Sequence, residues 1–432
     1  MPWLQLAVVL LFIFLGARLG SIGIGFAGGA GVLVLCSGLG MTPGSIPIDV
    51  ILIIMAVIGA VAAMQVAGGL DYLVQQTEKI LRRQPKHITL LAPLVTYIMT
   101  ILAGTGHTAY STLPVIVEVA KENGVRPSRP LSISIIASQI AITASPVSAA
   151  VVVFSGMLEP FNISYLDLLM IVIPTTLSAC MLTAIVCNFL GLDLDKDPVY
   201  QARLAQGLVY KHTNRTYTIK PKARLSVIIF ALTIFSVVIY ATLISDKLGI
   251  IQNPVLPRNE AIIVFMLTAA MLIALTTKIN THDILNAQTF KSGMSACICV
   301  LGVAWLGNTF VAGYIDQIKL VASELLTNYP WLLAVTLFFA SMLLYSQAVT
   351  VRALMPMALT LVDPIIAIAS FSAVSALFVL PTYPTLLAAV EMDDTGSTRI
   401  GKFIFNHSFF IPGVIAITLS VLFGFILAPL VV

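Results

Sequence analysis

Long apolar runs separated by short polar stretches follow one another from the beginning of the chain to its end. A bilayer core of about 30 Å is crossed by roughly 20 apolar residues in a helix, and most of the runs approach that length. The pattern predicts about ten transmembrane helices. The expected fold class is therefore an all-α polytopic membrane protein.

Small and polar residues interrupt some of these runs. In residues 88–120 the interruption is Gly104-Thr105-Gly106-His107-Thr108, and in residues 331–361 it begins at Ser346 and ends near Arg352. Two apolar arms shorter than a full span, joined by polar residues, predict a re-entrant hairpin that enters and leaves the bilayer on one side. We expect two such hairpins.

Proline-centred breaks interrupt two further apolar segments. Ser145-Pro146 lies within residues 131–157, and Pro381-Thr382-Tyr383 lies within residues 364–390. Proline lacks a backbone N–H and disrupts a helix interior. Each segment is therefore predicted to be one broken spanning helix.

The interrupted segments occur twice, which indicates an internal repeat. A shift of 245 residues places Val66-Ala67-Gly68 on Val311-Ala312-Gly313, and a shift of 242 places Leu113-Pro114 on Met355-Pro356. Paired, interrupted hydrophobic segments are typical of transporters built from two repeats, with the binding site where the breaks meet.

The repeat divides the chain into two halves and a linker. The first repeat, 1–190, contains scaffold helices 1–66, an interface helix 70–84, a hairpin 88–120, a broken helix 131–157 and a span 166–190. Residues 191–223 are the linker. The second repeat, 224–432, contains scaffold helices 225–310, an interface helix 315–328, a hairpin 331–361, a broken helix 364–390 and a span 403–430.

The basic residues predict the orientation, because cytoplasmic loops carry an excess of Lys and Arg. With the linker in the cytoplasm and both hairpins non-crossing, most of the 23 basic residues fall on the cytoplasmic side. Both termini are then periplasmic. The two halves have opposite orientations, so they form inverted-topology repeats.

Composition narrows the class of protein further. The chain is 59% hydrophobic and 10% charged, which excludes an ordinary soluble globule. The net charge of +4 is scattered between apolar segments, so nucleic acid is not an expected partner. The five cysteines lie in apolar runs without metal-site spacing, and Asp193, Asp195 and Asp197 are interpreted as a solvated loop. No cofactor and no metal site are expected.

The breaks predict the chemistry of the site. Non-helical backbone inside a bilayer is tolerated only around a protein-lined or water-filled cavity. At such breaks, helix N-termini present free N–H groups and a positive dipole end that suit carboxylates. Arg352 is a costly intramembrane cation, interpreted either as a forked donor to a substrate carboxylate or as a structural partner of an acid on another helix.

The predicted substrate-binding residues are the polar and small residues in or beside the breaks. His107 has two interpretations, a structural histidine or a group for substrate contact or proton coupling. Several of the hydroxyl residues are also suited to helix–helix contacts. The full set is Gly104, Thr105, Gly106, His107, Thr108, Ser138, Gln139, Ser145, Pro146, Ser346, Gln347, Thr350, Arg352, Pro381, Thr382 and Tyr383.

Five stretches taken together resemble the anaerobic C4-dicarboxylate transporters of the Dcu family. They are Gly104-Thr105-Gly106-His107 with Leu113-Pro114, Ser145-Pro146, Tyr345-Ser346-Gln347-Ala348, residues 380–384, and Met392-Asp393-Asp394-Thr395-Gly396. B-type members carry a lysine shortly before Ser-Gln-Ala, where this chain has Met342, so the A type is nearer.

The resemblance implies a carrier of the bacterial inner membrane that takes up or exchanges aspartate, fumarate, malate and succinate, typically as an antiporter. It also implies an elevator motion and a homodimer, as in related carriers with two hairpins. An H⁺ or Na⁺ ion as coupling partner is compatible with these residues. The alternatives are a cation-coupled symporter of another small carboxylate and an anion channel; an intramembrane enzyme would need a nucleophile and base beyond His107.

Overall fold

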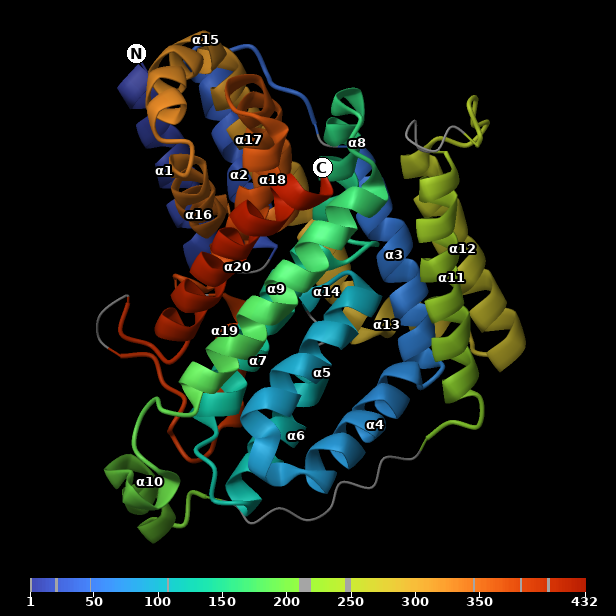
Figure 1. Ribbon diagram of the computed structural model, residues 1–432, viewed down its shortest axis with the longest axis vertical. Coiled ribbons are helices and arrows are strands. Elements are labelled where there is room, and N and C mark those ends of the chain that lie inside the picture. The colour runs from blue at the N-terminus through green and yellow to red at the C-terminus, as the bar shows by residue number, and fades with distance from the viewer. Residues whose placement is uncertain are drawn as a thin grey trace.

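The computed structural model describes residues 2–19, 22–46, 48–106, 109–209, 219–244, 250–344, 346–380, 383–401 and 405–432. Within these ranges the fold is helical, and the only extended pairing is an isolated bridge between Ile400 and His407. The predicted all-α class is confirmed. Figure 1 shows the helices packed side by side, many of them tilted from the vertical long axis.

The helices of the first half are α1 (Pro2–Leu19), α2 (Gly23–Leu33), α3 (Ile48–Val66), α4 (Gly69–Arg83), α5 (Ile88–Ala103), α6 (Ala109–Glu122), α7 (Ser128–Ile140), α8 (Ala149–Leu158) and α9 (Tyr165–Cys187). A π-helical turn, Val34–Gly38, extends α2, and a 3₁₀ turn, Ala141–Ala144, extends α7. Helix α10 (Pro198–Ala205) lies within the predicted linker.

The helices of the second half are α11 (Ala223–Leu243), α12 (Arg258–Thr277), α13 (His282–Asn286), α14 (Gln288–Cys299), α15 (Trp305–Asn328), α16 (Leu332–Leu344), α17 (Gln347–Leu361), α18 (Pro364–Ser370), α19 (Pro384–Met392) and α20 (Phe410–Val431). A π-helical turn, Val300–Ala304, joins α14 to α15, and a 3₁₀ helix, Phe371–Phe378, follows α18.

Seven helical segments in the described part of the chain are long and apolar enough to cross a bilayer, or eight if the pair α3 and α4, bent by 71°, counts as one span. Helices α1 and α2 fall short of that length. The predicted last span, 403–430, begins too early: α20 starts at Phe410. Asp393, Thr395 and Gly396, with φ +69°, form a turn-rich stretch before it.

A change in the backbone separates each predicted interface helix from the helical segment before it. Gly68 adopts φ +85° and separates α3 from α4, whose buried side chains Leu70, Val74, Thr77 and Leu81 recur at helical spacing. In the second half the backbone is non-helical at Tyr314, so α15 is kinked just before residue 315.

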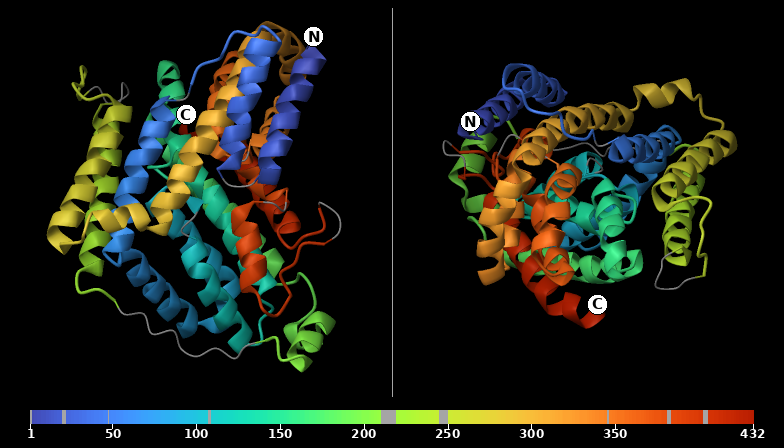
Figure 2. Two further views of the ribbon diagram at one scale, coloured as in Figure 1. Left: turned by 180° about the vertical axis from the view of Figure 1, so that it is seen from behind. Right: turned by 90° about the horizontal axis from the view of Figure 1, so that it is seen from above.

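Three apolar clusters divide the helices. The largest consists mainly of residues from α5 to α9 and α16 to α20, the second mainly of residues from α3, α11 and α12, and the third of residues from α1, α2 and α15. Seen from above in Figure 2, the helices of the two smaller clusters line one side of the molecule. We call the helices of the largest cluster the core body and those of the other two the wall.

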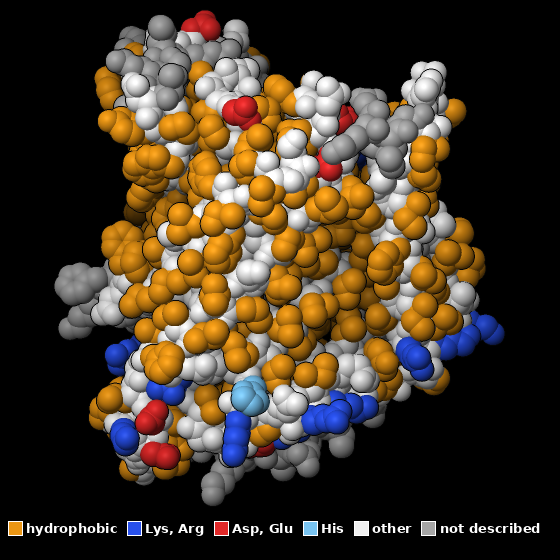
Figure 3. All heavy atoms as spheres, viewed as in Figure 1, with side chains coloured by type: hydrophobic (Ala, Val, Ile, Leu, Met, Phe, Trp, Pro, Cys, Tyr) orange, Lys and Arg blue, Asp and Glu red, His pale blue; other side chains and the backbone are white. Residues whose placement is uncertain are grey.

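Charged side chains lie at the ends of the molecule. On the face shown in Figure 3, a broad hydrophobic band lies between the lower end, where Lys and Arg gather with some Asp and Glu, and the upper end, where further Asp and Glu lie. Such a band is what a bilayer core requires of a spanning protein. The chain is therefore a multi-pass membrane protein.

Candidate functional site

The first interruption lies between α5 and α6. Helix α5 ends at Ala103 because Gly104 turns the backbone to φ +68°, and a Cβ there would lie 3.0 Å from Val147 Cγ2. Gly106 is buried and approaches Ser138, whose Oγ would lie 3.7 Å from an added Cβ. Thr105 between them is half-buried. The first interruption therefore packs against the break between α7 and α8.

Helix α6 returns to the end from which α5 starts. Arg82 at the end of α4 donates through Nη1 to Glu122 at the end of α6, over 2.5 Å, and lies 3.6 Å from Glu118. Since α5 begins a few residues after Arg82, both ends of the α5–α6 pair are at the same level of the molecule (Figure 1). The pair is a hairpin in shape.

The break between α7 and α8 is held by hydroxyl groups. Ser145 Oγ donates to the carbonyl of Ile101 over 2.7 Å, and Ser148 Oγ donates to that of Ile142 over 2.6 Å. Ser148 also caps α8 by accepting from the Val151 N–H. These bonds satisfy carbonyls that the break leaves without helical partners. Ser138 bonds within its own helix, to the Ile135 carbonyl.

Gln139 connects three of the interruptions. Its carbonyl accepts from Gln347 Nε2 at the start of α17 over 3.2 Å, and its own Nε2 donates to Thr385 Oγ1 in the first turn of α19 over 3.3 Å. All three side chains are buried. Gln139 Oε1 has no hydrogen-bond partner among the described residues. The break after α7 and the starts of α17 and α19 therefore lie side by side at Gln139.

Four helices begin at the interruptions. Helix α17 starts at Gln347, with Ser346 accepting from the Val349 N–H and Thr350 donating to the Ser346 carbonyl over 2.8 Å. Helix α8 packs against α17, and α6 packs against α19. Each N-terminus carries unsatisfied N–H groups and a positive dipole end. The starts of α17 and α19, both bonded to Gln139, thus offer a positive environment without many formal charges.

The remaining predicted residues lie close by or outside the described chain. Arg352 is half-buried on α17, five residues after Gln347, and Tyr383 is half-buried directly before α19. Pro146 is buried in the break, where its carbonyl accepts from the Tyr165 hydroxyl. His107, Thr108, Pro381 and Thr382 lie outside the described residues.

Three residues beside the breaks were not predicted. Thr385 contacts Gln139, Tyr165 contacts Pro146, and buried His407 has its Nε2 3.3 Å from the Val379 carbonyl. The repeat carried a signal for the last two, since the shift of 242 that aligns Pro114 with Pro356 also aligns Tyr165 with His407. The same shift aligns Thr385 with Thr143 of the first break.

Arg258 at the start of α12 joins the wall to the core body. It is 7% exposed, donates to Ser155 Oγ over 3.0 Å and pairs with Glu159. Its Cζ lies 5.5 Å from the centroid of the Tyr165 ring. The local sequence around Arg258 gives no indication of these contacts.

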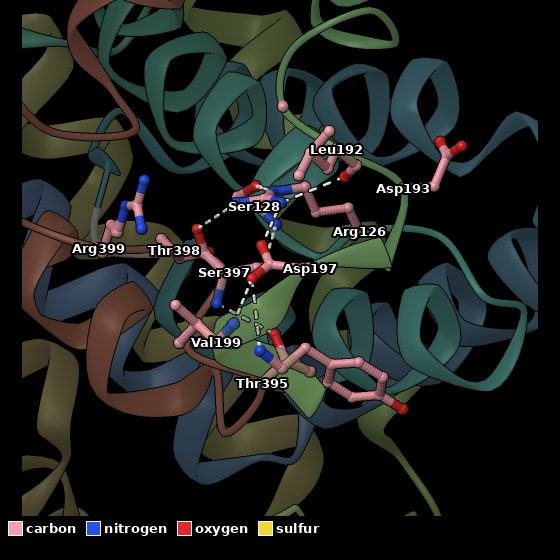
Figure 4. Close-up of polar contacts among 12 residues, drawn as sticks. Arg126, Ser128, Leu192, Asp193, Asp197, Val199, Thr395, Ser397, Thr398 and Arg399 are labelled. Carbon is pink, nitrogen blue, oxygen red and sulfur yellow. Dashed lines mark hydrogen bonds and ion pairs between the residues drawn. The ribbon is translucent and has the colours of Figure 1, made fainter. Parts of the chain in front are cut away.

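A second polar cluster lies where the predicted linker meets the core body (Figure 4). Arg126 pairs with buried Asp197 and donates to the Leu192 carbonyl, and the Ser128 N–H donates to Ser397 Oγ over 3.1 Å. The cluster ties three segments together: the connection from α6 to α7, the linker, and the stretch after α19.

The interpretation of Asp197 as part of a solvated loop is wrong. Its side chain is buried and caps α10 by accepting from the Val199 N–H over 2.8 Å. Burial raises the pKa of this carboxyl, but the N–H groups of Val199 and Tyr200 and the Arg126 guanidinium outweigh burial, so its pKa lies below the ordinary value. No cluster of potential metal ligands occurs in the described ranges.

A family model described as anaerobic C4-dicarboxylate membrane transporter matches residues 1–432. The chain is 67% identical over 427 residues to the C4-dicarboxylate transporter DcuA of Wolinella succinogenes, covering 99% of both chains. This chain belongs to the anaerobic C4-dicarboxylate transporter family. It is a transporter and not an enzyme.

Within the Dcu family the A type is nearer. The DcuA protein of Escherichia coli strain K12 is 59% identical over 425 residues, whereas an Escherichia coli DcuB is 39% identical over 438 residues. The resemblance inferred from the sequence is thus confirmed. A solved structure, that of the YdaH transporter of Alcanivorax borkumensis, has a similar fold, with a TM-score of 0.55, 13% identity and coverage of 99% of this chain and 96% of that one.

Proposed function

We propose that this protein carries C4-dicarboxylates such as aspartate, fumarate, malate and succinate across the bacterial inner membrane, by exchanging one for another. The observation that carries the proposal is that Gln139, beside the break after α7, joins the starts of α17 and α19 in a chain of the Dcu family. The substrate's two carboxylates match that environment, because N-terminal N–H groups and their dipoles favour anions.

Arg352 supports the same substrate class. It lies on α17 within two turns of the helix start, and guanidinium groups bind carboxylates through two parallel hydrogen bonds. The substrate-binding residues of the proposal are the sixteen predicted above. Thr385 is added to them because Gln139, which accepts a hydrogen bond from Gln347 of α17, also donates one to Thr385.

Inverted repeats are supported by the packing of equivalent helices. Helix α1 packs on α2 as α11 packs on α12, and α5 packs on α7 as α16 packs on the 3₁₀ helix after α18. The contact of α6 with α19 has its counterpart in the contact of α17 with α8. Figure 1 draws the first hairpin in the lower half of the molecule and the second, α16 and α17, in the upper half, which suits halves of opposite orientation.

An elevator motion is supported by the separate apolar clusters. Most buried apolar residues of the hairpins and broken helices belong to the core body. Most of those of α3, α11 and α12 belong to a second cluster, which Ala103, Val147 and Val152 also join. Helix α4 contributes Leu81 to the core body and Leu70 to the wall, which suits a connecting element. The proposal is that the core body moves with the substrate while the wall stays in place, with the linker cytoplasmic, both termini periplasmic and two copies forming a dimer.

Exchange follows from the charge of the site. An empty site retains exposed N–H groups and Arg352, which resist passage through the bilayer barrier, and a bound dicarboxylate neutralises them. The loaded body therefore moves more readily than the empty one.

The test is efflux of labelled succinate from proteoliposomes that contain the purified protein. We expect efflux to accelerate at least tenfold when unlabelled aspartate or fumarate is added outside. Equal efflux with and without an external dicarboxylate would rule out obligatory exchange. An ohmic current would favour an anion channel, and dependence on an imposed Na⁺ or H⁺ gradient would favour a symporter.

A further inference from the structure

Each half of the chain leaves a backbone carbonyl outside any helix at its proline-centred break. Pro146 lies between the 3₁₀ turn that ends at Ala144 and the start of α8 at Ala149. Val379 lies between the 3₁₀ helix that ends at Phe378 and the start of α19 at Pro384. In an apolar surrounding such a carbonyl needs a hydrogen-bond donor.

In the first half the donor is Tyr165. It is the first residue of α9, its side chain is fully buried, and its hydroxyl donates to the Pro146 carbonyl. The ring is also the one that faces Arg258. Removing only the hydroxyl would therefore leave the ring contacts in place.

In the second half the donor is His407. Its ring is 8% exposed and packs beside Phe409 and Phe410, with centroids 6.0 Å and 5.9 Å away. Nε2 lies 3.3 Å from the Val379 carbonyl. A carbonyl only accepts, so Nε2 carries the proton. Nδ1 is buried without a hydrogen-bond partner among the described residues.

The two donors are equivalent in position but different in chemistry. Tyr165 begins the last long helix of the first half, and His407 lies three residues before α20, the last helix of the second. The shift of 242 residues aligns one with the other. What the two rings share is a buried N–H or O–H that reaches the carbonyl of a break. A purely apolar packing role would need neither.

We propose that Tyr165 and His407 are positioning residues for substrate binding. Each fixes the carbonyl of its break and thereby the direction of the helix that follows, α8 in the first half and α19 in the second. Neither residue touches the substrate; each acts through the helix N-terminus that does. This inference rests on the proposed function, because it concerns the affinity of the same dicarboxylate site.

The experiment compares counterflow of labelled succinate in proteoliposomes for wild type, Tyr165→Phe, His407→Phe and His407→Gln. The two Phe variants keep the ring and lose the donor, and we expect each to raise KM by about threefold to tenfold with Vmax changed by about twofold or less. Gln restores an N–H donor, so His407→Gln is expected to return KM close to the wild-type value.

Tyr240→Phe is the matched control. Its hydroxyl donates to the Leu256 carbonyl over 2.8 Å, a bond of the same kind in the wall. We expect this variant to leave KM unchanged. If both Phe variants also leave KM unchanged, or lower Vmax alone, the residues are structural and the inference is wrong. A KM for His407→Gln as high as that for His407→Phe would equally contradict it.

Two further measurements keep the outcome decisive. If His407→Phe does not fold, Tyr165→Phe tests the inference at the other break. The rise of the thermal unfolding midpoint with added succinate then reports affinity without transport, and an undiminished rise would overturn the inference. If the wild-type protein exchanges no C4-dicarboxylate, the proposed function is wrong. If the wild type does exchange them and the variants keep the wild-type KM, only the inference about Tyr165 and His407 is wrong.

Discussion

At the scale of single residues, the site depends on a glycine that no other residue can replace without strain. Gly104 ends α5 with φ +68°, and its α-carbon faces the carbonyl and side chain of Val147 across the break. A side chain at this position would be strained by the backbone and crowded by Val147 at once. The contact between the first hairpin and the first broken helix therefore requires glycine.

Gly104→Ala tests this requirement. The left-handed backbone alone costs an L-residue about 1–2 kcal/mol, and an added Cβ would lie 3.0–3.1 Å from Val147 atoms. We expect a lower thermal unfolding midpoint in detergent and slower succinate exchange. Gly156→Ala is the control, since Gly156 is helical and has open space around it. If Gly104→Ala and Gly156→Ala had the same unfolding midpoint and the same exchange rate, glycine would not be required at position 104.

At the scale of elements, the breaks could be predicted from the sequence and the buried ion pairs could not. Gly104 and Pro146 stand out because an apolar run with a glycine or proline and hydroxyl residues has few roles in a bilayer. Arg126 and Asp197 are 71 positions apart, and nothing in either local pattern indicates that the chain brings them together. The capping of α10 by Asp197 is a separate, local contact, made through the other carboxylate oxygen.

Asp197→Asn should release α10 from the core body. Removing one charge of a buried ion pair leaves the other charge uncompensated, which lowers the free energy of unfolding by about 3–5 kcal/mol. We expect trypsin to cleave after Arg203 faster than in wild type. Asp195→Asn, a change at an exposed neighbour, should leave the cleavage rate as it is. A cleavage rate for Asp197→Asn equal to wild type would refute the pairing.

The attachment of α10 to the core body should also depend on pH. The pKa of Asp197 is lowered in the folded protein, so its contribution to stability is present above the ordinary value of about 3.9 and is lost as pH falls through the folded value. Acid should therefore loosen α10 in wild type and have a smaller effect in Asp197→Asn.

At the scale of the whole molecule, Arg258 is a polar contact between the wall and the core body. An elevator motion has to separate the guanidinium of α12 from Ser155 and Glu159 of the segment around α8. The contact stabilises the conformation described above relative to any in which the core body has moved. Nothing in the sequence indicates this contact, because Arg258 and Glu159 lie 99 positions apart.

Glu159→Gln should weaken this contact. The substitution removes the charge from one hydrogen bond at a partly exposed site. We therefore expect the backbone amides of residues 155–161 and of the first turn of α12 to exchange hydrogen about tenfold faster than in wild type. Mass spectrometry of the exchanged peptides measures it. Glu260→Gln, an exposed change two residues from Arg258, serves as control. Unchanged protection in Glu159→Gln would show that the pair does not hold the two bodies together.

The clamp formed by Arg126 and Asp197 also has a consequence for the path of the chain. Because α10 is fastened to the core body and α11 begins in the wall, the chain between Ala205 and Ala223 is one of the segments that connect the two bodies. Fully stretched, it spans roughly 60 Å. If the core body moves against the wall as proposed, that contour length is the largest separation of α10 from α11 that the chain allows.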